Sequence, residues 1–124
     1  MLHDVFGNLT FNVGWKARKN IKLFDKDYCI NLKVKAYFEE DGITKEQEDA
    51  YIGFCKAENN KLHIVEKLLE EYSDLPEKKF VPKTLLINRD GSYALLCDDN
   101  DAPDEGIAVC LSPEEVIMSQ DDYL

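Results

Sequence analysis

The sequence predicts an α+β domain in which two helices pack on one face of a mostly antiparallel six-stranded sheet, in the order β-β-β-α-α-β-β-β. Three observations lead to this prediction. The first third of the chain alternates apolar and polar residues, as strands with one solvated face do. The middle third has apolar residues at helical spacing. The last third contains short, uninterrupted apolar runs, which are typical of strands covered on both faces.

The N-terminal third is expected to form three strands, over residues 3–6, 9–24 and 28–38. Turn-forming residues separate them at Gly7-Asn8 and Asp25-Lys26-Asp27, and Lys19-Asn20 is expected to interrupt the second strand. The third strand has the most regular alternation in the chain. Its polar face carries Lys33 and Lys35, and the neighbouring strand carries Lys16 and Arg18. These cations could form a basic patch, but a solvated sheet face is the favoured interpretation.

The middle third is expected to form two helices. Thr44 followed by Gln47 is a capping box, and acidic residues just after Thr44 are stabilising at the N-terminus of a helix, the positive end of its dipole. The first helix should therefore begin at Thr44 and end near residues 59–60. A second apolar face predicts another helix over residues 61–73, which Pro76 helps to stop.

Three apolar strands are expected after the helices, over residues 84–88, 93–97 and 106–111, with a tight turn at Asp90-Gly91. We expect them in the middle of the sheet. Ser112-Pro113 could cap a helical turn in the tail that follows. With 124 residues, the chain has room for a single domain, over residues 1–124.

The charge is unevenly distributed along the chain. The net charge is −10, and residues 98–124 contain nine acidic residues and no Lys or Arg. Part of this region is an acidic loop between the last two predicted strands. Such a region repels nucleic acid and favours a basic protein partner, and the alternative interpretation is that the acidity serves solubility alone. The candidate partner-binding residues are Asp98, Asp99, Asp101, Asp104 and Glu105.

No motif indicates catalysis, a metal or a cofactor. The acidic loop fails the EF-hand pattern, because Pro103 and Asp104 stand where an acidic ligand and a glycine belong, although a looser calcium site remains an alternative. His3 and His63 lie in no catalytic motif, and the glycines form no phosphate-binding loop. The four cysteines have no zinc spacing, so we expect them to be small core residues. The expected protein is therefore not an enzyme and has no cofactor.

Targeting signals are equally absent from the sequence. Its N-terminus lacks the basic and apolar segments of a signal peptide, and no apolar run is long enough to cross a bilayer. The expectation is a cytoplasmic protein without a membrane partner. Nothing in the sequence indicates an oligomeric state.

Several short motifs together resemble an uncharacterised family of small acidic bacterial domains, and the resemblance covers nearly the whole chain. The motifs are Phe6-Gly7-Asn8-Leu9, Gly14-Trp15, Asp41-Gly42-Ile43-Thr44, Gly106-Ile107-Ala108-Val109 and Ser119-Gln120-Asp121. Some of these domains are candidate toxin-immunity proteins. The resemblance therefore implies a non-enzymatic immunity-type inhibitor that neutralises a basic toxin through its acidic C-terminal surface. The alternative is a domain that binds a divalent cation or a small ligand.

Overall fold

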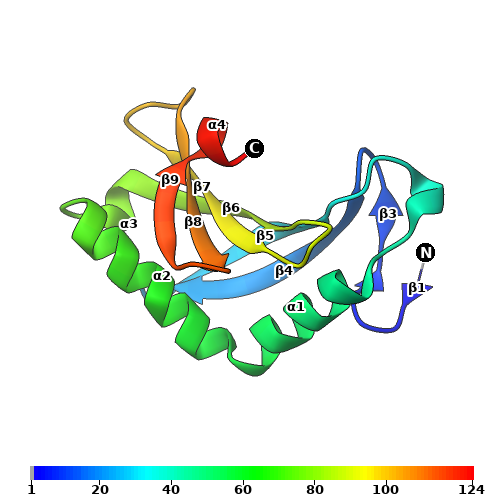
Figure 1. Ribbon diagram of the computed structural model, residues 1–124. Helices are drawn as coiled ribbons and strands as arrows, with labels where there is room; N and C mark the ends of the chain where they lie inside the picture. Colours follow the sequence, from blue (N-terminus) through cyan, green and yellow to red (C-terminus); the bar gives the residue numbers. More distant parts are fainter. Residues whose placement is uncertain (1) are drawn as a thin grey trace.

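A computed structural model describes residues 2–124, and its main feature is a twisted sheet of seven strands in the order β3-β4-β5-β6-β7-β8-β9 (Figure 1). All neighbouring pairs are antiparallel except β5 and β6, which are parallel. The strands are β1 (Leu2–His3), β2 (Gly7–Asn8), β3 (Thr10–Phe11), β4 (Trp15–Leu23), β5 (Lys26–Val34), β6 (Phe80–Ile87), β7 (Tyr93–Asp99), β8 (Gly106–Ser112) and β9 (Val116–Ser119). The helices are the 3-10 helix η1 (Glu39–Asp41) and α1 (Lys45–Lys56), α2 (Glu58–Tyr72), α3 (Pro76–Lys79) and α4 (Gln120–Tyr123).

The α+β class and the mostly antiparallel sheet are confirmed, but the expected six strands in the order β-β-β-α-α-β-β-β are wrong in detail. The tail adds β9 to the free edge of β8, where backbone hydrogen bonding outweighs the helical signal after Ser112-Pro113. A helical turn, α4, does form directly after β9. The Ser119 hydroxyl caps it by accepting from Asp122 N–H at 3.1 Å.

The N-terminal strands also differ from the prediction. Gly7 and Asn8 form β2, which pairs with β1 in a separate two-stranded sheet. The break at Lys19-Asn20 does not occur, because the Lys19 side chain lies beneath the helices and its ammonium reaches the Glu58 carboxylate at 2.8 Å. The turn between β4 and β5 is the two-residue Phe24-Asp25, with φ of 51° and 63°.

Helices α1 and α2 connect β5 to β6 and cover one face of the sheet (Figure 1). The two helices are almost continuous, since only Ala57 separates them. Thr44 and Gln47 form the predicted capping box. Gln47 is also completely buried, and its Nε2 donates to the carbonyl oxygens of Lys35 (2.9 Å) and Ile87 (3.3 Å). It therefore fastens the start of α1 to the place where the parallel strands end.

The main core lies between this sheet face and the helices. Its sheet residues are Trp15, Ile21, Leu23, Ile30, Leu32, Val34, Phe80, Leu85, Ile87, Tyr93, Leu95, Cys97, Ile107, Val109 and Leu111. The helices contribute Phe54, Leu62, Val65 and Leu69. A second, smaller core on the opposite face consists of Ala94, Ala108 and Cys110, with Tyr123 of α4 packed against it. On that face α4 covers only the β7–β9 half of the sheet, and the β4–β5 half carries polar residues.

The cysteines do not all lie in the core, which corrects the sequence expectation. Cys97 and Cys110 are buried, but Cys29 and Cys55 are exposed, and all four are free thiols. The alternation of side chains along β5 places Cys29 on its polar face, and Cys55 points outward from α1. Burial, with a smaller effect from Asp98, raises the pKa of the Cys97 thiol to about 12.

Candidate functional site

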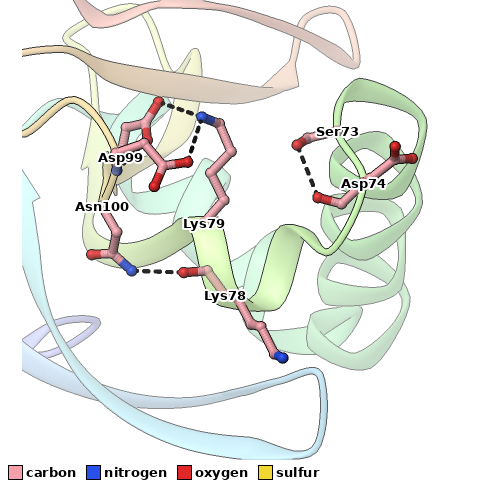
Figure 2. A network of polar contacts seen from close by, with 7 residues as sticks. Ser73, Asp74, Lys78, Lys79, Asp99 and Asn100 are labelled. Carbon is pink, nitrogen blue, oxygen red and sulfur yellow. Dashed lines mark hydrogen bonds and ion pairs between the residues drawn. The ribbon is translucent and has the colours of Figure 1, made fainter.

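The acidic loop predicted from the sequence, residues 98–105, begins with Asp98 and Asp99, the last two residues of β7, and leads to β8. It is held against α3 (Figure 2). The Lys79 ammonium, at the end of α3, lies 3.3 Å from the Asp99 carboxylate and 3.2 Å from the Asp101 carboxylate. The hydrogen bond to Asp101 and the contacts with Asp99 raise the pKa of Lys79 despite desolvation. Lys79 therefore forms a clamp on the loop, which we call the Lys79 clamp.

Two further hydrogen bonds complete this attachment. Asp101 N–H donates to the Asp99 carboxylate at 2.9 Å within the loop. Asn100 Nδ2 donates to the Lys78 carbonyl of α3 at 2.9 Å (Figure 2). Burial would raise the pKa of Asp99, but the hydrogen bond from Asp101 and the ammonium of Lys79 lower it below its ordinary value. The loop is thus an ordered part of the fold.

The five candidate residues consequently fall into two groups. Asp99 and Asp101 already have a cationic partner inside the chain. Asp98, Asp104 and Glu105 are exposed, and within residues 2–124 they form no ion pair. These three carboxylates remain available to a partner molecule.

A cleft of about 310 Å³ lies between the loop and the tail. Carboxylates reach it from two parts of the chain, Asp99 and Glu105 from the loop and Asp121 from α4. Tyr72 and Ser119 also line it. The amide of Gln120 fixes the tail next to the loop by donating to the Cys97 carbonyl at 2.9 Å. The fold therefore brings together acidic residues that are separated in the sequence by all of β8 and β9.

No metal centre accompanies this cleft. Among residues 2–124, no three His, Cys, Asp or Glu side chains are grouped so that they could hold a metal ion. The two histidines have local roles: His3 Nδ1 accepts from Val5 N–H at 3.1 Å, and His63 lies 3.3 Å from the Glu66 carboxylate on the same helix. Over the same residues, no helix has the length and apolarity required to span a membrane.

The Lys79 clamp is the part of the site that the sequence analysis missed. In the sequence, Lys78 and Lys79 lie in a short stretch of mixed charge between the second predicted helix and the next predicted strand. The signal for the clamp is the hairpin register. Pairing of Ile87 with Tyr93 across the Asp90-Gly91 turn would place Phe80 opposite Asn100, and the irregularity between Pro82 and Thr84 shifts its partner by one residue to Asp99. That pairing brings the residue before Phe80 alongside the acidic loop.

Comparisons with protein families, with curated proteins and with solved structures found no match to this chain.

Proposed function

We propose that this chain is a non-enzymatic binding protein, an immunity-type inhibitor that acts in the cytoplasm and neutralises a basic protein toxin. Its binding site is the acidic surface formed by Asp98, Asp104, Glu105, Asp121 and Asp122. The observation that carries the proposal is the cleft in which Glu105 of the loop and Asp121 of the tail converge. The free thiols of Cys29 and Cys55 support a reducing compartment.

The chemistry of the cleft suits an inserted lysine or arginine side chain. Carboxylates accept hydrogen bonds from a guanidinium in a bidentate geometry, and such charge-assisted bonds are among the strongest in proteins. The hydroxyl groups of Tyr72 and Ser119 can accept the remaining donors. No Lys or Arg occurs between residue 90 and the end of the given sequence, so the surrounding field attracts a cationic partner over a distance of about a Debye length.

The Lys79 clamp gives this surface its shape. It orders the loop before the partner arrives, so binding does not have to offset the entropy of ordering a free loop. Asp99 and Asp101 are accordingly positioning residues, whereas the three exposed loop carboxylates and α4 make the contacts. A toxin that acts on nucleic acid needs a cationic surface for its substrate, and an acidic inhibitor covers such a surface directly.

The test is a binding measurement in which the protein product of the neighbouring gene is the candidate partner. We expect the double variant Glu105→Gln and Asp121→Asn to weaken binding by about tenfold or more, and wild-type binding to weaken steeply with added salt. The matched control is Glu114→Gln with Glu115→Gln, which removes the same charge between β8 and β9, outside the cleft. Equal losses in both double variants would indicate general charge attraction instead of a site, and no loss in either would refute the acidic-surface proposal.

The alternative of a divalent-cation domain has less support, because the Asp99 and Asp101 carboxylates of the loop are paired with Lys79. Calorimetric titration with calcium tests it separately, and saturable heat at micromolar ion would favour it.

A further inference from the structure

We propose that the sheet face opposite α1 and α2 contains a second site, opposite in charge to the first, which binds a small amphiphilic carboxylate. This inference goes beyond the proposed function and does not depend on it. The site is a pocket of about 300 Å³ on the seam between the parallel strands β5 and β6. Its lining residues are Lys16, Asn31, Lys33, Thr84, Leu86, Leu96 and Leu124.

Strand register explains why these residues meet. Lys16 pairs with Lys33 across β4 and β5, and Lys33 pairs with Leu86 across the parallel seam. Asn31 pairs with Thr84 across the same seam, and Thr84 pairs with Leu96 across β6 and β7. Cross-strand partners point to the same face of a sheet, so one wall of the pocket is polar and cationic and the other is built of leucines.

The two lysines have no anionic partner. Among residues 2–124, the ion pairs involve Lys19, Lys79 and His63, but neither Lys16 nor Lys33. Like charges directly opposite each other destabilise a sheet, and an anion held between them would offset that repulsion. In support, burial lowers the pKa of the Lys33 ammonium, and the nearby charges of Lys16 and Lys35 lower it further.

The lining argues against a simple solvated face, the interpretation favoured from the sequence. A solvated face needs neither a hollow nor an apolar wall. Here α4 covers only the β7–β9 half of the face, and the hollow lies where this cover ends. Lys33 is partly buried in it, and Leu86 is only 3% exposed.

The composition of the walls selects the class of ligand. Two ammonium groups, an amide and a hydroxyl are suited to a carboxylate head, and the leucines are suited to a short alkyl chain. The volume is at the lower end of the range for small-molecule sites, which disfavours a nucleotide. A purely polar anion such as inorganic phosphate would leave the leucine wall unused.

The experiment compares four probes, hexanoate, acetate, 1-hexanol and inorganic phosphate, by amide chemical-shift titration of the chain. Hexanoate has both the head and the tail, acetate has only the head, and 1-hexanol has only the tail. We expect hexanoate to bind saturably and to shift the amides of Asn31, Thr84 and Leu96. Acetate and 1-hexanol should each bind about tenfold more weakly or worse.

Variants of the two lysines test where the carboxylate of hexanoate binds. Lys16→Met with Lys33→Met should weaken hexanoate binding by about tenfold or more, whereas the control Lys67→Met, on the exposed side of α2, should leave it unchanged. If the double variant fails to fold, the single variant Lys33→Met and the residues whose amide shifts change in the wild-type protein show whether hexanoate binds in this pocket. The proposal is overturned if hexanoate causes no saturable shifts in this pocket, if phosphate binds as tightly as hexanoate, or if the folded lysine variants bind hexanoate as wild type does.

Discussion

Replacing Gln47 with methionine tests the link between the helices and the sheet. Methionine has a similar length but no amide, so the Thr44 N–H loses its acceptor at 3.0 Å, and the Lys35 and Ile87 carbonyls each lose a donor. Both carbonyls keep a second donor, Arg89 Nη1 for Lys35 and Lys35 N–H for Ile87. The cost is therefore one unpaired donor and two lost hydrogen bonds, a decrease in the free energy of unfolding of roughly 2–3 kcal/mol.

Urea unfolding followed by circular dichroism measures this change. The control is Lys45→Met, an exposed position two residues earlier on the same helix, which should change the free energy of unfolding by less than about 0.5 kcal/mol. Gln47→Glu should be at least as destabilising as Gln47→Met, because it keeps the acceptor but places a charge in a fully buried position. Wild-type stability in Gln47→Met would refute the inference that this amide joins α1 to the parallel strands.

Three further predictions follow from the turn, the loop and the thiols. Gly91→Ala should lower the free energy of unfolding by about 1–3 kcal/mol in urea titrations, because φ is +90° and a Cβ would lie 2.9 Å from the Glu46 carbonyl oxygen. Gly53→Ala, with open space around it, should raise the free energy of unfolding. A Gly91→Ala protein more stable than the Gly53→Ala protein would contradict the close packing of Gly91 against Glu46. Since the pKa of Asp99 is depressed, its stabilising contacts are present above its ordinary pKa of 3.8 and are lost as the pH falls through the lowered value. Hydrogen exchange should therefore show protection of the Asp101 amide down to about pH 4, and loss of protection well above that pH would contradict the Lys79 clamp. Mass spectrometry of iodoacetamide-treated protein should show modification of Cys29 and Cys55 well before Cys97 and Cys110, and early modification of Cys97 would contradict its burial.

The elements predicted best are those whose signals are local. Thr44 and Gln47 lie three residues apart and cap their helix as expected, and the uninterrupted apolar runs form β6, β7 and β8. The position of the acidic loop followed from those runs. Local pattern was sufficient because each of these signals lies within a single turn or strand.

The features missed depend on contacts between distant segments. Lys19-Asn20 is typical of a break in a strand, but the Lys19 ammonium forms an ion pair with the carboxylate of Glu58, which belongs to a helix far along the chain. Val116 to Ser119 becomes a strand only because the edge of β8 is free to pair. The Lys79 clamp and the basic pocket likewise depend on strand register, which single-strand periodicity does not specify.

The parallel pairing of β5 with β6 has a consequence for folding kinetics. The β4–β5 hairpin and the β6–β9 meander each contain contacts between neighbouring segments, whereas the seam between them closes a loop that includes both long helices. Because loop closure costs entropy before distant contacts compensate for it, we expect the two halves to form early and to join late. The pocket lined by Lys33 and Leu86 spans that junction, so a molecule bound there would slow the separation of the halves and lengthen the lifetime of the native state.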